Sequence, residues 1–125
     1  MNIAILTEYK KEKGIGHLIR TYSIVNTFRD KSYSIEFIID TYEDNLLIDT
    51  SEYTKFNWLT DNIINSYDAI LIDTYSIKKY NWINLRKKSK VIFYIDDGNI
   101  AIPFPDIILI FKKRNQRKSR CKRIR

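Results

Sequence analysis

Glycine, proline and cysteine are scarce in this chain, with 3, 2 and 1 copies among 125 residues. So little glycine and proline excludes a linker-rich, collagen-like or disordered chain. A single cysteine, Cys121, excludes an internal disulfide, and no cysteine or histidine ligand set surrounds it to form a zinc site. No apolar run approaches the roughly 20 residues of a membrane-spanning helix. We therefore expect a soluble, globular protein.

The first residues also lack the features of a secretory signal. Residues 1–6 have no basic start, no long apolar stretch follows them, and no small-residue cleavage site is visible. We therefore expect a cytoplasmic location. A hydrophobic content of 44% in a chain of this length is sufficient for one domain with its own core.

The net charge of +7 is unevenly distributed along the chain. Residues 112–125 contain no acidic side chain, and residues 1–111 have 13 basic and 15 acidic side chains, a net charge of −2. The basic residues of the last segment are Lys112, Lys113, Arg114, Arg117, Lys118, Arg120, Lys122, Arg123 and Arg125. Because this segment has almost no apolar content, we predict one domain over residues 1–111 and a disordered basic tail over residues 112–125.

Two interpretations of this tail remain open. It could contact phosphates as an arm for nucleic acid or for an anionic membrane surface. Alternatively, it is a solvated tail or the out-of-frame end of a truncated gene. No aromatic residue is interleaved with the basic ones for base stacking, so nucleic acid is not the partner that we favour.

Short apolar runs alternate with amphipathic segments through the first 111 residues. We predict strands over 2–7, 34–40, 53–59, 69–73, 91–95 and 107–111, and helices over 17–28, 61–66 and 77–88. This alternation is typical of βαβ units with right-handed crossovers. The predicted fold class is therefore α/β, with a Rossmann-like parallel sheet.

Three polar groups follow predicted strands, at residues 14–17, 73–75 and 96–98. Ligands of open α/β sheets bind at the carboxyl ends of the strands. Asp96 and Asp97 could suggest a metal pair, but adjacent strand-end side chains point in opposite directions, so we interpret them as a loop cap and predict no metal site.

The turn between the first strand and helix is the most informative motif. Gly14 and Gly16 allow close backbone approach, and the N–H groups of the following helix favour an anionic ligand. Ile19 stands where the dinucleotide-binding fingerprint requires a third glycine, so that fingerprint is excluded. The helix dipole favours a neutral imidazole at His17, as a general base requires, although His17 could equally cap or pack at the turn.

Two further residues have open interpretations. Arg20 lies one turn after His17 and could bind a phosphate or carboxylate of a ligand, or form an ion pair within the protein. Asp73 could orient the loop that follows it, or cap the next turn.

These motifs together resemble a known family. The segments Gly14-Ile15-Gly16-His17-Leu18-Ile19-Arg20, Asp73-Thr74-Tyr75 and Ile95-Asp96-Asp97 are similar to the amino-terminal half of the UDP-2,4-diacetamido-2,4,6-trideoxy-β-L-altropyranose hydrolases of pseudaminic acid biosynthesis. They also resemble related predicted glycosyltransferases of spore-coat polysaccharide synthesis. The resemblance covers nearly all of residues 1–110.

The resemblance implies the amino-terminal half of a glycosyltransferase-B-type fold, in which a carboxy-terminal domain holds most of the nucleotide. It implies a reaction without metal or cofactor, in which water attacks the anomeric carbon of a nucleotide-sugar substrate and UDP leaves. It makes His17 the base that activates water. The substrate-binding residues that it implies are Gly14, Gly16, Arg20, Asp73 and Tyr75.

The chain also departs from the family pattern. It has Leu6-Thr7-Glu8 where the family has an Arg-x-Asp pattern, and Thr74 where a histidine is common. The family continues with a second domain, so we expect a truncated member that is inactive alone, or one completed by a separate carboxy-terminal chain. The alternatives are a glycosyltransferase half-domain and a small polyanion-binding protein that uses the basic tail.

Overall fold

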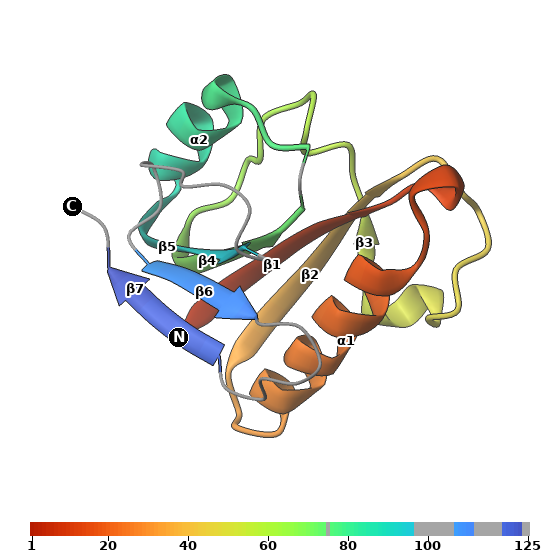
Figure 1. The fold of residues 1–125 in the computed structure, drawn as a ribbon, viewed down its shortest axis with the longest axis horizontal. Helices are drawn as coiled ribbons and strands as arrows, with labels where there is room; N and C mark the ends of the chain where they lie inside the picture. Colours follow the sequence, from red (N-terminus) through yellow and green to blue (C-terminus); the bar gives the residue numbers. More distant parts are fainter. Residues whose placement is uncertain (75, 97–106, 112–118, 124–125) are drawn as a thin grey trace.

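The computed structural model describes residues 1–74, 76–96, 107–111 and 119–123, and a seven-stranded sheet forms its centre (Figure 1). The strands are β1 (Asn2–Tyr9), β2 (Ser34–Thr41), β3 (Thr54–Lys55), β4 (Tyr67–Asp73), β5 (Ser89–Asp96), β6 (Ile107–Phe111) and β7 (Ser119–Arg123). Their order is β3-β2-β1-β4-β5-β6-β7, and all neighbours are parallel except β6 and β7. The helices are α1 (Gly16–Arg29) and α2 (Lys79–Arg86), with short 3₁₀ helices η1 (Lys11–Lys13) and η2 (Thr50–Glu52). The predicted α/β Rossmann-like fold is confirmed.

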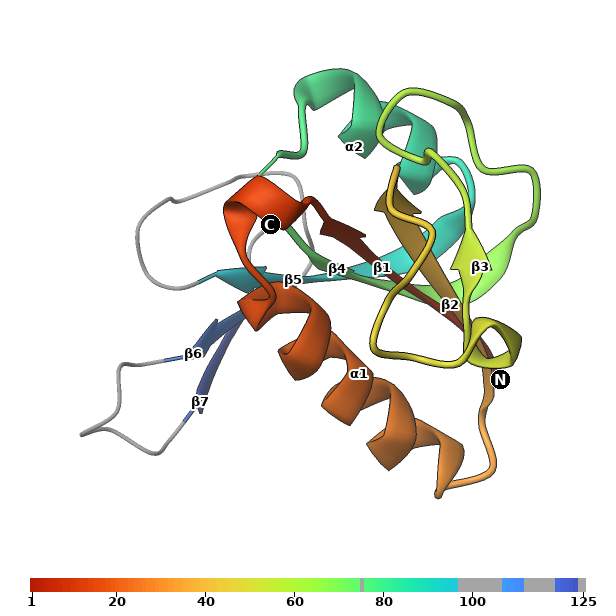
Figure 2. The same ribbon diagram turned by 90° about the vertical axis from the view of Figure 1, so that its right-hand side faces the viewer.

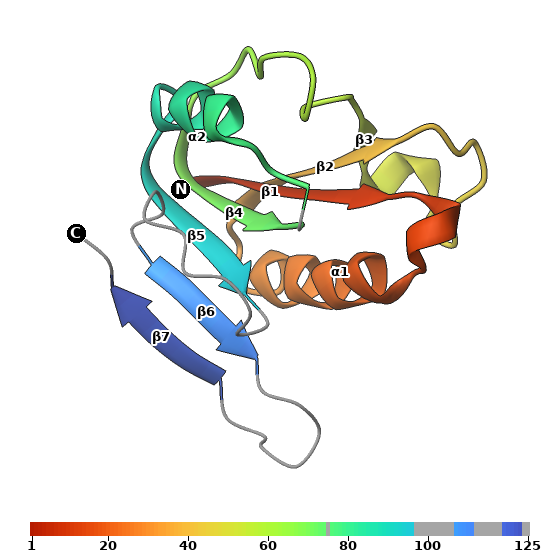
Figure 3. The same ribbon diagram turned by 45° about the horizontal axis from the view of Figure 1, so that its top comes forward.

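The two helices cover opposite faces of the sheet (Figures 2 and 3). Because successive side chains of a strand point to opposite faces, each central strand contributes to both cores. The core on the α1 face contains Ile3, Ile5, Phe37, Ile39 and Leu71 packed with Leu18 and Val25 of the helix. The core on the α2 face contains Ala4, Leu6, Ile70, Ile72 and Tyr94 packed with Trp82 and Leu85.

The centre of the sheet is a topological switch point. Helix α1 connects β1 to β2 on one face, and α2 connects β4 to β5 on the other, while β1 and β4 are neighbours. The chain therefore leaves the carboxyl ends of β1 and β4 in opposite directions. In open α/β sheets this is where ligands bind.

The predicted helix over residues 61–66 is wrong, because the structure has no helix there. Ile63 is buried in the core on the α2 face, whereas Ile64 is 84% exposed, so an extended segment buries one apolar side chain without helical spacing. A helix of six residues also has too few hydrogen bonds to offset the cost of nucleation. The Nζ of Lys88 donates a hydrogen bond to the carbonyl of Ile64 (3.1 Å) and ties this segment down.

Part of the basic segment belongs to the sheet. Residues 119–123 form β7, which pairs antiparallel with β6. The backbone of an edge strand presents N–H and C=O groups that a further strand can satisfy, whatever the composition of that strand. Residues 112–118, 124 and 125 lie outside the described residues, and the division of the chain at residue 111 stays a prediction.

Neither α1 nor α2 is long and apolar enough to cross a membrane, and the described part of the chain offers no other candidate helix.

Candidate functional site at the switch point

Asp73, the last residue of β4, is the centre of a buried polar cluster. Its side chain is fully buried on the α1 face and accepts hydrogen bonds from three residues of α1. The donors are Nδ1 of His17 (2.8 Å), Nη2 and Nε of Arg20 (2.6 and 3.0 Å) and Oγ1 of Thr21 (2.7 Å). Residues three and four apart lie on one side of a helix, so the first two turns of α1 present all three donors to one carboxylate.

The pKa of Asp73 reflects two opposing effects. Burial raises the pKa of the carboxyl, but the hydrogen bonds from His17, Arg20 and Thr21 and the charge of Arg20 outweigh it. The net result is a pKa below the ordinary value of 3.8. Asp73 is therefore an ionised carboxylate at neutral pH, and it can only accept hydrogen bonds.

The ionised state of Asp73 defines the tautomer of His17. A contact of 2.8 Å between Nδ1 and a carboxylate oxygen requires a proton on Nδ1. Nη2 of Arg20 also lies 3.1 Å from this nitrogen. Because the guanidinium nitrogen is a donor as well, it cannot accept the proton of Nδ1. Nδ1 therefore donates its proton to the carboxylate of Asp73. In the neutral ring the lone pair then lies on Nε2, which is the nitrogen that can accept a proton.

The ends of β1 and β4 are held together by two further hydrogen bonds. The hydroxyl of Thr7 donates to the carbonyl of Asp73 (2.7 Å), and the indole N–H of Trp58 donates to the carbonyl of Thr7 (2.8 Å). All three residues are buried. These two hydrogen bonds hold the end of β4, and with it the buried carboxylate of Asp73, in place relative to β1.

The glycine turn leads from β1 into α1. Gly14 has φ of 82° and ψ of 177°, a conformation that is almost restricted to glycine. Gly16 is the first residue of α1, and a Cβ added at either glycine meets no described atom within 4 Å. The Cβ positions of both glycines therefore face open space, which leaves room for a ligand to approach the backbone of this turn.

Lys10 anchors the segment between the end of β1 and Gly14. Its Nζ lies 2.8 Å from Oδ1 of Asp40 and 5.0 Å from the ring centre of Tyr42. The hydroxyl of Tyr42 donates a hydrogen bond to Glu12, and this bond, together with desolvation, raises the pKa of Tyr42 to about 12. These contacts tie the loop before Gly14 to the end of β2.

Replacing Gly14 by alanine is expected to lower the free energy of unfolding by about 1–3 kcal/mol, because alanine is strained at this φ and ψ. The matched variant Gly16→Ala occupies a helical position with open space around it, so its stability should not fall. Chemical denaturation of both variants measures the difference. Equal stability of the two variants would contradict the assigned backbone conformation at Gly14.

The structure brings together most of the predicted site residues that it describes. His17, Arg20 and Asp73 are in direct contact, and both glycines lie on the turn before them. Asp73 is fully buried and forms an ion pair with Arg20. The substrate-binding roles predicted for these two residues stay predictions. Tyr75 and Asp97 lie outside the described residues.

Sequence reasoning missed Thr21. Within the helix predicted over residues 17–28, the apolar Ile19 is 54% exposed, whereas Thr21 is fully buried. Thr21 is buried because its hydroxyl lies 2.7 Å from the carboxylate of Asp73 and 2.6 Å from the carbonyl of His17. In the sequence, the sign that Thr21 could join the site is its position four residues after His17, which places both residues on one side of the helix.

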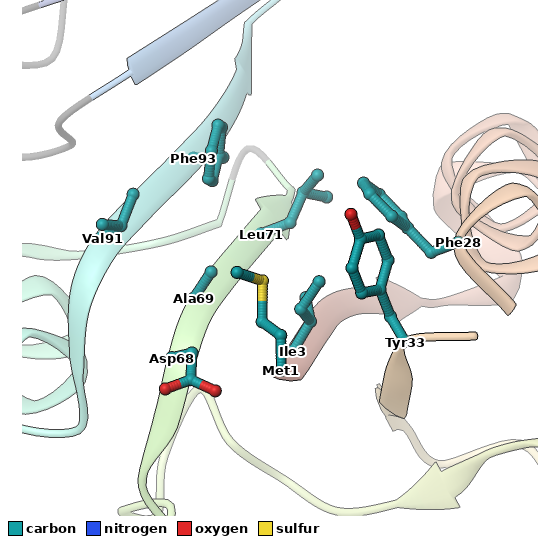
Figure 4. A pocket seen from close by; sticks show the side chains of 9 residues that line it. All are labelled: Met1, Ile3, Phe28, Tyr33, Asp68, Ala69, Leu71, Val91 and Phe93. Carbon is teal, nitrogen blue, oxygen red and sulfur yellow. The ribbon is translucent and has the colours of Figure 1, made fainter. Parts of the chain in front are cut away.

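Two further features of the described residues concern other kinds of site, a metal centre and an apolar cavity. No group of three His, Cys, Asp or Glu side chains lies together there as metal ligands would. A cavity of about 310 Å³ lies at the opposite end of the sheet, between the amino-terminal halves of the strands and the end of α1 (Figure 4). It is lined by Met1, Ile3, Phe28, Tyr33, Asp68, Ala69, Leu71, Val91 and Phe93. This largely apolar cavity contains none of the predicted site residues.

The fold and the site together define an α/β protein with a Rossmann-like sheet and a buried Asp–His–Arg cluster at its switch point. No family model, curated protein or solved structure matches the chain. The family resemblance of its motifs therefore stays a prediction, and function is argued from the site.

Proposed function

We propose that this chain is the sugar-side domain of a nucleotide-sugar hydrolase, in which His17 is the general base. The observation that carries the proposal is the hydrogen bond between Nδ1 of His17 and the buried carboxylate of Asp73 at the switch point. A carboxylate that orients an imidazole and stabilises its protonated form is a recurring arrangement for proton abstraction. The motif resemblance supplies the substrate class, a UDP-linked deoxy-amino sugar.

In the proposed reaction, Nε2 of His17 removes a proton from a water molecule as its oxygen bonds to the anomeric carbon. The bond between that carbon and the phosphate oxygen breaks, and UDP leaves with the bonding electrons. Asp73 stays ionised throughout and stabilises the imidazolium. The backbone N–H groups that follow Gly14 and Gly16 lie at the positive end of α1, where they favour the negative charge of the diphosphate.

The proposal gives Arg20 a positioning role. Its guanidinium contacts Asp73 through two nitrogens and also approaches His17. This bidentate contact neutralises the buried carboxylate and restricts its rotation. Arg20 thereby maintains the acceptor that holds the ring of His17.

The test is a titration of the isotope-labelled chain with UDP-2,4-diacetamido-2,4,6-trideoxy-β-L-altropyranose, followed by NMR. Binding is measured because the resemblance places most of the nucleotide on a second domain. We expect shifts at the amides of residues 14–20 and at the ring of His17. Gly16→Ala should weaken these shifts without lowering stability, because its methyl group occupies the space beside the first turn of α1.

Two results would contradict the proposal. One is the absence of shifts at millimolar nucleotide sugar. The other is a set of shifts restricted to the basic segment and abolished by salt, which would favour the polyanion-binding alternative instead.

A further inference from the structure

We infer that Thr21 is a positioning residue that selects the tautomer of His17 with its lone pair on Nε2. The inference rests on the proposed function, in which this lone pair accepts a proton from water. Thr21 acts through Asp73, because its hydroxyl holds the carboxylate in the orientation that the ring of His17 requires.

Packing alone does not explain a hydroxyl at this position. The buried residues of α1 are Leu18, Thr21 and Val25, so Thr21 lies in the stripe of the helix that packs on the sheet. Valine has almost the shape of threonine and would fill this place without a polar atom. Because a buried hydroxyl costs free energy unless it is hydrogen-bonded, the role of this one lies in its hydrogen bond.

The single hydroxyl proton of Thr21 has two acceptors within reach. Its Oγ1 lies 2.7 Å from Oδ2 of Asp73 and 2.6 Å from the carbonyl oxygen of His17. A hydrogen bond to an ionised acceptor is stronger than one to a neutral carbonyl. The proton of Thr21 therefore goes to the carboxylate.

The two oxygens of Asp73 have different partners. Oδ1 accepts from Nδ1 of His17 (2.8 Å) and Nη2 of Arg20 (2.6 Å). Oδ2 accepts from Nε of Arg20 (3.0 Å) and from the hydroxyl of Thr21. Thr21 thus holds the carboxylate at the oxygen that His17 does not use. This contact opposes a rotation of the carboxylate that would turn Oδ1 away from Nδ1.

Arg20 makes the orientation of the carboxylate decisive, because its Nη2 lies 3.1 Å from Nδ1 of His17. If Oδ1 turned away, Nδ1 would lose its acceptor, and Nη2 could donate a hydrogen bond to an unprotonated Nδ1. The proton of the neutral ring would then be on Nε2, and no lone pair would be left there to accept a proton from water. The hydrogen bond from Thr21 favours the first of these two arrangements.

The test compares Thr21→Val, which removes the hydroxyl, with Thr21→Ser, which keeps it. Thr27→Val is the matched control on the same helix. Thr27 is exposed, and its hydroxyl donates to the carbonyl of Ser23 (3.0 Å), the same contact four residues back that Thr21 has with His17. The ¹⁵N NMR spectrum of the His17 ring, recorded without ligand at alkaline pH, gives the ratio of the two neutral tautomers. Calorimetry gives the thermal midpoints.

We expect Thr21→Val to shift the tautomer ratio toward the proton on Nε2 by about 10-fold, the lower end of the range for a hydrogen bond to a charged group. Thr21→Ser and Thr27→Val should keep the ratio of the unaltered chain. An unchanged ratio in Thr21→Val, even with a lower thermal midpoint, would show a structural role and overturn the inference. An equal shift in Thr27→Val would overturn it too. If valine prevents folding, Thr21→Ala takes its place with the same expected and contrary results.

This measurement needs no substrate, so its outcome is separate from that of the proposed function. A shifted ratio in Thr21→Val, with no response of the unaltered chain to the nucleotide sugar, would contradict the proposed function and leave the control of the tautomer by Thr21 standing. A response to the nucleotide sugar with an unchanged ratio in Thr21→Val would overturn this inference alone.

Discussion

Replacing Asp73 by asparagine is expected to lower the free energy of unfolding by about 3–5 kcal/mol, the range for breaking a buried ion pair by removing one partner. The carboxylate is fully buried and accepts four hydrogen bonds from His17, Arg20 and Thr21. Asparagine has the same shape, but it leaves the guanidinium of Arg20 without its buried counter-charge. Urea denaturation at pH 7 measures the change. Asp44→Asn is the control, because Asp44 is exposed and its pair with Lys55 is a surface pair.

The loss of stability in Asp73→Asn should depend on pH. The folded state depresses the pKa of Asp73 below 3.8, so the carboxylate contributes stability above that value and loses it as the pH falls through the folded pKa. The difference in stability between the unaltered chain and Asp73→Asn should therefore be full at pH 5–7 and shrink below about pH 4. A difference that stays constant down to pH 2 would contradict the assigned ion pair.

Replacing His17 by asparagine is expected to lower kcat for release of UDP from the nucleotide sugar by about 10²–10⁴, the contribution of a positioned general base. The side-chain amide of asparagine can replace the Nδ1–H donor to Asp73, so this variant removes the base and keeps the donor. The assay includes the carboxy-terminal domain that the family resemblance implies. Stability should change far less than in Asp73→Asn.

A control on the same helix separates this effect from damage to α1. Ser23 is exposed, and its hydroxyl donates only a local hydrogen bond to the carbonyl of Ile19 (3.2 Å). Ser23→Ala should leave turnover unchanged. If His17→Asn retains more than about a tenth of the turnover, the assignment of His17 as the base is wrong.

Most of the sheet could be predicted from the sequence because β1, β2, β4, β5 and β6 are largely apolar runs, whereas β3 (Thr54–Lys55) and β7 (Ser119–Arg123) are not. Ile107–Phe111 was predicted with the bounds that β6 has, and α1 differs by one residue at each end. Periodicity succeeds in these segments because burial on a sheet or helix face determines the residue pattern. Hydrophobic periodicity failed at residues 61–66. This irregular segment buries one isoleucine, Ile63, and its sequence resembles the first turn of a helix.

The site could be predicted only in part. Most of its residues other than Thr21 were found, because Gly14, Gly16 and His17 form a local motif and Asp73 ends an apolar run. Their contacts could not be predicted, because His17 and Asp73 are 56 residues apart and meet only through the order of β1 and β4 in the sheet.

Glu8 illustrates the same limit. It follows the strand predicted over residues 2–7 and begins a charged stretch of the sequence, yet it lies within β1 and is buried. Its partner Ser76 is 68 residues away. Burial of a charged residue depends on such distant partners, and local composition does not reveal them.

The most direct test of the account is the ¹⁵N NMR spectrum of the His17 ring, with and without the nucleotide sugar. The chain has a single histidine, so the signals need no assignment by mutation. We expect the neutral ring to carry its proton on Nδ1 and its lone pair on Nε2, and we expect the Nε2 signal to change when the nucleotide sugar is added. A proton on Nε2 in the neutral ring, or ring signals that ignore the nucleotide sugar, would contradict it.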